Sequence, residues 1–166
     1  MTPAQRILAL AADTGAALAA RGWRVACAES CTAGGIAYAL TSVPGSSAWF
    51  ERGWVTYSNA AKHEELGVPV ALIEGLGAVS VPVVRAMALG ALGRSGADLV
   101  LAVSGIAGPG GGVPGKPVGT VCLGWARRVG EAIEVRVATR HFVGDRAAVR
   151  SAAIVAALEG AIEWLR

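Results

Sequence analysis

Hydrophobic positions recur along the chain with two different periods, which predicts strands interleaved with helices. Residues 98–104 (DLVLAVS) form a nearly continuous apolar run, typical of a strand that is covered on both faces and central in its sheet. Residues 132–142 instead alternate apolar and charged side chains between Ile133 and Val137, which indicates a strand with one solvated face. Apolar residues at near-helical spacing predict a helix over residues 146–164.

Capping residues mark where the predicted helices begin and end. Thr2 and Pro3 open the first helix and Gly22 ends it, whereas Ser58 and Ser80 are expected N-caps further along. Asp145 caps the last helix in the same way. The predicted helices cover residues 3–21, 33–41, 59–66, 81–94 and 146–164, and the predicted strands cover 23–28, 54–57, 98–104, 118–126 and 132–142.

This order predicts an α/β fold: a three-layer α/β/α sandwich around a mixed sheet, in a single domain over residues 1–166. The last two strands should form an antiparallel hairpin that turns at Val129-Gly130. A connector is expected to begin at Val68-Pro69. A length of 166 residues with 54% hydrophobic content suits one well-buried domain.

The high mean hydropathy of +0.52 raises the question of a membrane span. The longest uncharged runs, residues 30–50 and 99–115, contain glycine, proline and hydroxyl side chains, so neither is expected to cross a bilayer. The N-terminal segment has no basic opening and carries Asp13, which argues against a signal peptide. Three cysteines are an odd number without a disulfide framework. We expect a cytoplasmic protein with reduced thiols and no membrane partner.

The charged residues are scattered along the chain. The net charge is +3, and the densest basic pair is Arg127-Arg128 in a predicted turn. No basic stripe interleaved with aromatic residues is present, so nucleic-acid binding is not expected. A small anionic substrate fits the mild positive charge equally well.

Candidate chemistry gathers in residues 45–62 (GSSAWFERGWVTYSNAAK), which hold several hydroxyls and one amine. Lys62 is one of only two lysines against thirteen arginines. Unlike arginine, a lysine can lose its proton when it is desolvated, so Lys62 could serve as a general base for a nearby serine. The alternative is a solvated lysine on a short helix.

A second candidate is the cluster Glu29-Ser30-Cys31-Thr32, at a predicted corner between a strand and a helix. Free N–H groups at such a corner can hold an anion or a polarised oxygen. Ser30 and Thr32 could equally be simple caps of the helix. Cys31 could be a nucleophile paired with a histidine, although a buried cysteine at a strand end is more common.

The loop from Gly105 to Pro117 has six glycines and three prolines among its thirteen residues, which favours a ligand loop over a merely flexible turn. Gly110 to Lys116 matches part of a P-loop, but Pro117 replaces the magnesium-binding hydroxyl and a strand is predicted next. A dinucleotide fingerprint fails because no helix follows the glycines. The G-x-S-x-G and S-x-x-K nucleophile motifs are absent. Two isolated histidines without CxxC spacing make a metal site unexpected, and no cofactor is expected.

Taken together, three segments resemble the CinA C-terminal domain family: AESCTAGG at 28–35, PGSSAWFERGWVTYSNAAK at 44–62, and SGIAGPGGG with KPVGTV within 104–121. The closing FVGDRAAVR at 142–150 extends the resemblance over nearly the whole chain. Ala33 stands where members often have glycine. Members include nicotinamide-nucleotide amidohydrolases. Some members carry a large N-terminal domain that is absent here, so this sequence resembles the stand-alone form.

The resemblance implies hydrolysis of the carboxamide of nicotinamide mononucleotide to nicotinate mononucleotide and ammonia, by a metal-independent Ser-Lys mechanism. It implies Ser47 as nucleophile, Lys62 as its base and Tyr57 in support. The residues implied for the substrate pocket are Ser30, Thr32, Ser104, Gly105 and Arg146.

Three matters stay open from the sequence. The oxyanion could be held by N–H groups near Ser47 or in the loop from Gly105 to Gly112. The domain could be a non-catalytic nucleotide-binding module, or an amidase for a related amide. A homo-oligomer is expected.

Overall fold

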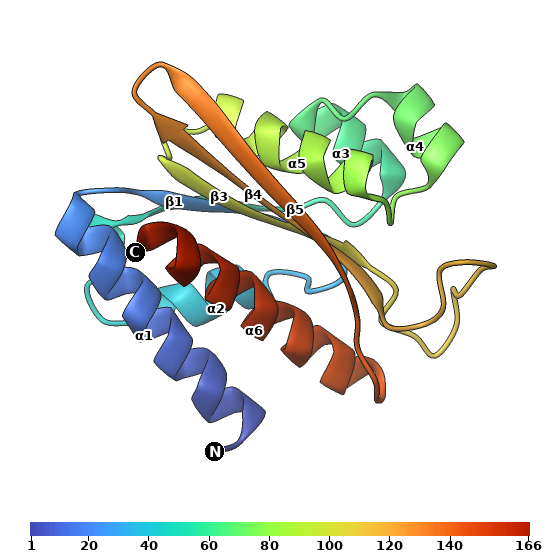
Figure 1. Ribbon diagram of the computed structural model, residues 1–166, viewed down its shortest axis with the longest axis horizontal. Coiled ribbons are helices and arrows are strands. Elements are labelled where there is room, and N and C mark those ends of the chain that lie inside the picture. The colour runs from blue at the N-terminus through green and yellow to red at the C-terminus, as the bar shows by residue number, and fades with distance from the viewer.

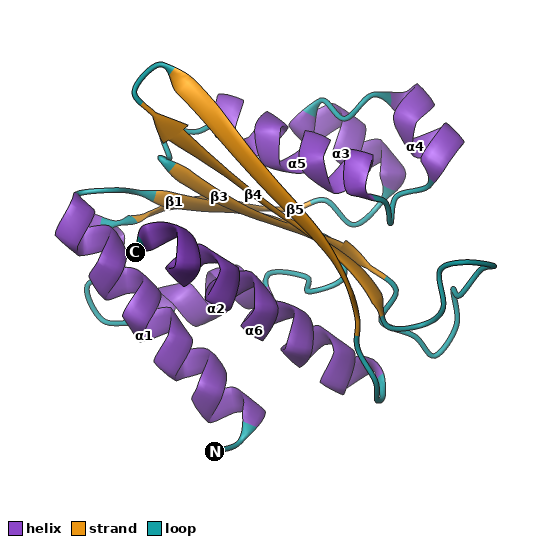
Figure 2. Ribbon diagram, in the orientation of Figure 1, coloured by secondary structure: helices purple, strands orange, loops and turns teal.

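The computed structural model describes residues 1–166 and contains one five-stranded sheet between two layers of helices (Figures 1 and 2). The strand order is β2-β1-β3-β4-β5. Strands β1, β2 and β3 run parallel to one another, whereas β4 and β5 join antiparallel. The predicted three-layer α/β fold around a mixed sheet is confirmed, with β3 at its centre. The strands are β1 (Val25–Glu29), β2 (Phe50–Val55), β3 (Leu99–Gly105), β4 (Thr120–Val129) and β5 (Ala132–His141).

The helices divide between the two faces of the sheet (Figure 1). One face carries α1 (Pro3–Arg21), α2 (Gly35–Thr41) and α6 (Arg146–Leu165). The other face carries α3 (Asn59–Leu66), α4 (Val70–Leu76) and α5 (Val81–Gly93). A short 3-10 turn, η1 (Ser46–Ala48), precedes β2.

Alternation along the strands builds a separate hydrophobic core on each face. Val25 and Cys27 of β1 pack in the core beneath α1, α2 and α6, whereas Ala26 and Ala28 pack in the core beneath α5. Every residue of β1 is buried, which follows from its place between two parallel neighbours with helices above and below. The carboxyl end of β1 is therefore held rigidly from both sides.

The predicted caps are present. Thr2 forms a capping box with Gln5, and Ser58 Oγ accepts from Ala61 N at 3.0 Å. Asp145 Oδ1 accepts from Ala148 N at 2.9 Å. Gly22 ends α1 in the left-handed conformation at φ 63, where a side chain would be disfavoured. These local signals explain why most helix ends can be predicted to within two residues.

Two elements differ from the prediction. Strand β2 begins at Phe50, four residues earlier than expected, and ends at Val55. As an edge strand it tolerates the polar pair Glu51-Arg52, which hides its pattern in the sequence. Helix α4 is absent from the prediction, because its N-cap position is Pro69 and no side chain caps its first turn. It occupies part of the expected connector.

Helices α3 and α5 approach each other closely at Gly90. A Cβ atom placed on Gly90 would lie 1.9 Å from the carbonyl oxygen of Leu66 at the end of α3. Because real Cβ contacts are never so short, the absence of a side chain at Gly90 is what permits this packing. The position of α3 matters because it carries Lys62.

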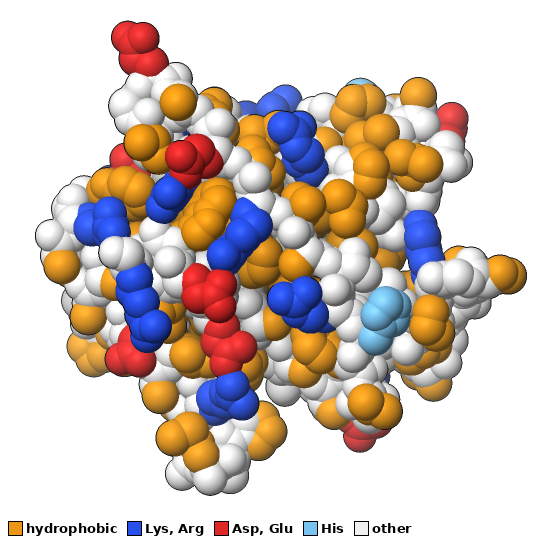
Figure 3. Space-filling view, in the orientation of Figure 1, with side chains coloured by type: hydrophobic (Ala, Val, Ile, Leu, Met, Phe, Trp, Pro, Cys, Tyr) orange, Lys and Arg blue, Asp and Glu red, His pale blue; other side chains and the backbone are white.

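The surface over α1, α6 and β5 mixes basic and acidic side chains (Figure 3). Arg6 pairs with Glu159, and Arg136 pairs with Glu163 at 3.0 Å. None of the helices combines the length and the apolar character that crossing a membrane requires.

Candidate active site

A cavity of about 260 Å³ opens at the carboxyl ends of the parallel strands. The chain leaves β1 toward α2 on one face of the sheet and leaves β2 toward α3 on the other, so the strand ends border a crevice. Strand ends, α3, α6 and the glycine-rich loop all contribute to the lining. The lining residues are Ser30, Cys31, Tyr57, Lys62, Ala78, Val79, Ser104, Gly105, Ile106, Ala107, Gly108, Gly110, Gly111 and Arg146.

A larger hollow of about 630 Å³ lies between the start of α1 and α6. Most of its lining is apolar, and its two charged side chains, Arg6 and Glu159, are already paired with each other. No lysine, histidine or cysteine lines this hollow. The smaller cavity is therefore the better candidate for an active site.

Lys62 is the buried centre of the smaller cavity. Its side chain is 1% exposed, and its Nζ donates to Ser30 Oγ at 2.9 Å. Two backbone carbonyls complete the set, Thr56 O at 2.8 Å and Tyr57 O at 3.1 Å. Three acceptors thus surround one amine.

This geometry suits an amine that loses one proton. Burial lowers the pKa of Lys62 from its ordinary value of 10.5, because a desolvated ammonium is disfavoured. A neutral amine keeps two N–H donors, enough for the carbonyls of Thr56 and Tyr57, and gains a lone pair. The remaining neighbour is Ser30 Oγ, whose proton that lone pair can accept. The structure therefore joins a serine hydroxyl to a buried amine.

The turn that carries Ser30 is fixed by backbone contacts. Ser30 N donates to Val103 O at 3.1 Å, and Ser30 O accepts from Ala33 N at 3.0 Å. The next two N–H groups, those of Cys31 and Thr32, donate to no backbone carbonyl. Free N–H groups directly after a nucleophile can stabilise an oxyanion.

Gly105 allows β3 to end close to that turn. A Cβ atom there would lie 3.0 Å from Cys31 Sγ and 2.7 Å from Val121 Cγ2. Ser104 is 1% exposed and donates from its hydroxyl to Ala78 O at 2.8 Å. Both residues border the cavity, but the Ser104 hydroxyl is engaged in holding the segment before α5.

Tyr57 and Arg146 form one side of the cavity mouth. The Arg146 guanidinium donates to the Tyr57 hydroxyl at 2.9 Å and to Gly108 O at 2.7 Å. Arg146 is the first residue of α6, directly after the cap Asp145. The contact of Tyr57 with Lys62 runs through its backbone carbonyl, whereas its phenol reaches Arg146. Both residues remain accessible from the solvent.

Thr32 is predicted as a pocket residue but lies behind the cavity. Its side chain is 1% exposed, and its hydroxyl donates to Glu29 Oε1 at 2.6 Å. It is not part of the cavity lining. The sequence of the Glu29-to-Thr32 cluster indicates that these residues lie near the site, but it does not indicate which way each side chain points.

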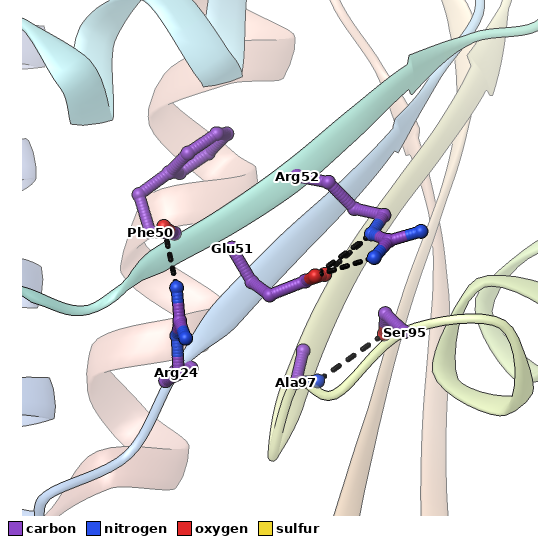
Figure 4. A network of polar contacts seen from close by, with 6 residues as sticks. All are labelled: Arg24, Phe50, Glu51, Arg52, Ser95 and Ala97. Atoms are coloured by element: carbon purple, nitrogen blue, oxygen red, sulfur yellow. Dashed lines mark hydrogen bonds and ion pairs between the residues drawn. The ribbon is translucent and has the colours of Figure 1, made fainter. Parts of the chain in front are cut away.

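Ser47 does not meet Lys62. It is an exposed residue of η1, before β2, whereas Lys62 follows the other end of that strand. Six strand residues at about 3.3 Å each separate the two ends by roughly 20 Å. Polar contacts surround the starting end of β2: Arg24 donates to Phe50 O at 3.4 Å, and Glu51 pairs with Arg52 at 2.7 Å (Figure 4). The serine that contacts Lys62 is instead Ser30.

The thiol of Cys31 has a different character from the Ser30 hydroxyl. Burial raises the pKa of Cys31 to about 11, so the thiol stays protonated at neutral pH. Neither His63 nor His141 lines the cavity, which leaves Cys31 without the histidine partner considered from the sequence. No three His, Cys, Asp or Glu side chains gather in the protein as metal ligands would.

Several apolar lining residues carry no signal in the sequence. Ala78 and Val79 precede the cap of α5, and Ile106 and Ala107 follow β3. Each is an ordinary loop residue in its local pattern. Only the packing of the loop between α4 and α5 against the end of β3 brings them together.

The sequence model described as the CinA C-terminal domain matches residues 7–165. The nicotinamide-nucleotide amidohydrolase PncC of Enterobacter agglomerans is 55% identical over 158 residues, which cover 95% of this chain and 94% of that protein. The protein of the same name from Escherichia coli K12 is 50% identical over 92% of this chain and 91% of its own length. The crystal structure of the competence/damage inducible protein CihA from Agrobacterium tumefaciens superposes with a TM-score of 0.90 at 42% identity, covering 97% of this chain and 96% of that one.

Proposed function

We propose that this chain, which belongs to the CinA C-terminal domain family, hydrolyses the carboxamide of nicotinamide mononucleotide. The products are nicotinate mononucleotide and ammonia. The relatives named nicotinamide-nucleotide amidohydrolase support this reaction, because they match this chain over more than nine-tenths of their length. The observation that carries the proposal is the hydrogen bond between Lys62 Nζ and Ser30 Oγ at 2.9 Å.

The nucleophile in this proposal is Ser30, in place of Ser47. Ser30 lines the cavity and touches the one buried amine of the chain, whereas Ser47 lies exposed at the far end of β2. Lys62 is the general base, because burial lowers its pKa and its other two contacts are fixed carbonyls. Tyr57 supports Lys62 through its carbonyl and orients Arg146 through its hydroxyl.

The charge of the lining supports an anionic substrate. The cavity contains the side chains of Lys62 and Arg146 and no carboxylate. The N–H groups of Gly108, Gly110 and Gly111 donate to no acceptor in the protein, as in loops that cradle phosphates. Arg146 sits exposed at the mouth, where a guanidinium can pair with a phosphate. The nucleotide phosphate is assigned to this side and the carboxamide to Ser30.

The reaction runs in two halves. Ser30 Oγ attacks the carboxamide carbon while its proton passes to Lys62 Nζ, and the N–H groups of Cys31 and Thr32 stabilise the oxyanion. The C–N bond then breaks, and the proton on Lys62 goes to the departing nitrogen, which leaves as ammonia. Water attacks the resulting ester, one proton returns through Lys62 to Ser30 Oγ, and nicotinate mononucleotide is released.

The test compares two serine variants. Ser30→Ala should lower ammonia release from nicotinamide mononucleotide roughly 10⁴-fold, because a triad-type nucleophile acts only as a unit with its base. Ser47→Ala is the matched control and should keep near-normal turnover. The rates are measured as ammonia released per folded protein, with folding checked by thermal unfolding. The same assay after dialysis against EDTA should give unchanged rates, because no cluster of metal-ligating side chains lies at the site.

The alternatives predict other outcomes. A non-catalytic nucleotide-binding module would bind nicotinamide mononucleotide without releasing ammonia. An amidase for a related amide would release ammonia from that amide and not from the nucleotide. Normal turnover in Ser30→Ala together with loss in Ser47→Ala would reject Ser30 as the nucleophile.

A further inference from the structure

The carboxylate of Glu29 lies buried directly behind the turn that carries Ser30. Glu29 is 1% exposed, and the hydrogen bonds of its carboxylate all go to that turn and the helix that follows. Its Oε1 accepts from Thr32 Oγ1 at 2.6 Å and from Ile36 N at 2.9 Å, and its Oε2 accepts from Ala37 N at 3.0 Å. Three donors on one buried carboxylate form a strong, geometrically fixed contact.

Glu29 and Ser30 point to opposite faces of the sheet. The contacts of Glu29 are with α2, whereas the hydroxyl of Ser30 contacts Lys62 of α3 on the other face. Glu29 is not part of the cavity lining. Any effect of Glu29 on the reaction must therefore pass through the backbone of the turn.

That backbone needs external support. Ala33 adopts φ 48 and Gly34 φ 90, both in the left-handed region. For Ala33 this conformation costs about 1–2 kcal/mol. Helix α2 has no side-chain cap at Gly34, so the N–H groups of Ile36 and Ala37 in its first turn rely on Glu29.

Arg150 contacts the turn from the helical layer of α6. Its guanidinium donates to Thr32 O at 3.5 Å, while the Thr32 hydroxyl is held by Glu29. Thr32 is thus fixed at both its carbonyl and its side chain. The free N–H groups of Cys31 and Thr32 and the Ser30 hydroxyl all belong to this one clamped segment.

We propose that Glu29 is a positioning residue for the amide hydrolysis, which clamps the Ser30-to-Gly34 turn so that Ser30 Oγ stays within reach of Lys62 Nζ. The proposal rests on the proposed function, because it assigns Glu29 to the same nucleophile. Misplacing a reacting group by about 1 Å costs on the order of 10²-fold in rate. The loss of the clamp should therefore appear in kcat.

The first experiment replaces the carboxylate with an amide of the same shape, in Glu29→Gln. One oxygen of the new side chain can still accept from Thr32, but its NH₂ group faces the N–H of Ala37, donor against donor. We expect kcat to fall by roughly 10-fold, with KM for nicotinamide mononucleotide within about twofold of the wild type. Glu64→Gln, at an exposed glutamate of α3 without a partner, is the matched control.

A second pair of variants tests whether Glu29 acts through Thr32. Thr32→Val removes the donated hydroxyl at nearly constant volume, and Thr32→Ser keeps it. Thr32→Val should lower kcat in the same way as Glu29→Gln, Thr32→Ser should rescue it, and the double variant should lose less than the two single losses multiplied. A purely structural role would lower the unfolding temperature while leaving kcat per folded molecule unchanged.

Hydrogen exchange tests whether Glu29 clamps the turn without relying on the proposed function. In Glu29→Gln, exchange should accelerate in the segment from Ser30 to Ala37 and stay unchanged in α5. If the wild type releases no ammonia, the proposed function fails, and the exchange result alone decides whether Glu29 clamps the turn. Unchanged exchange in this segment, or a folded Glu29→Gln protein with wild-type kcat, would overturn the inference.

Discussion

The state of one proton on Lys62 determines whether the proposed site can act. Below its lowered pKa the amine is an ammonium and cannot accept the proton of Ser30; above it the lone pair is available. We therefore expect kcat/KM to rise with pH in proportion to the deprotonated fraction. The rise should level off below 10.5, the ordinary pKa of lysine.

The measurement is kcat/KM for ammonia release from mildly acidic pH upward, because this ratio reports groups of the free enzyme. Lys62→Arg is the informative comparison, since its guanidinium keeps the charge and does not lose its proton. It should be inactive at every pH. A flat profile in the wild type, or activity in Lys62→Arg, would contradict a role for Lys62 as base.

At the residue scale, the sequence singles out Lys62 but not the serine that Lys62 contacts in the structure. Lys62 stands out because lysine is rare in this chain, which is a property of composition. Ser47 is close to Lys62 along the chain, and Ser30 is 32 residues away. Because a strand is extended, residues on either side of β2 lie far apart in space although they are close in sequence.

Among the elements, α3 can be tested directly because it presents Lys62 to the cavity. Gly90→Ala would place a Cβ atom 1.9 Å from Leu66 O and push α3 away from α5. We expect a loss of about 1–3 kcal/mol in the free energy of unfolding, as in other overpacked contacts, together with a lower kcat.

Gly93→Ala is the matched control at the end of the same helix. Nothing lies within 4 Å of a Cβ atom at Gly93, so the substitution should be neutral or stabilising by up to about 1 kcal/mol, because alanine favours helices. Urea denaturation followed by circular dichroism measures both changes. Equal stability of the two variants would show that the close approach of α3 to α5 does not affect the free energy of unfolding.

At the element scale, local signals are enough wherever they exist. Side-chain caps and left-handed glycines predict both ends of α1 and α3, side-chain caps predict the starts of α5 and α6, and the apolar run predicts β3 at the centre. Helix α4 has no such cap, and β2 is a polar edge strand. Their formation depends on packing between distant segments, which local periodicity does not record.

For the whole molecule, the cavity depends on contributions from both helical layers. Lys62 comes from α3 on one face of the sheet and Arg146 from α6 on the other, while Ser30 lies at the strand end between them. The sandwich itself follows from the alternation of helices and strands. The meeting of these three residues does not follow from that alternation. It depends on connections that leave the strand ends toward opposite faces of the sheet. The expected homo-oligomer stays a prediction.

The contrast in exposure between the two cations of the site has a consequence for ionic strength. Lys62 is 1% exposed and beyond the reach of mobile ions, whereas Arg146 faces the solvent. The Debye length shrinks from about 10 Å at 0.1 M salt to about 3 Å at 1 M, so salt should raise KM for the nucleotide and leave kcat nearly constant. Nicotinamide riboside, which lacks the phosphate, should show a KM that salt does not change. A salt-dependent kcat would mean that counterions reach the buried amine, contrary to its place in the fold.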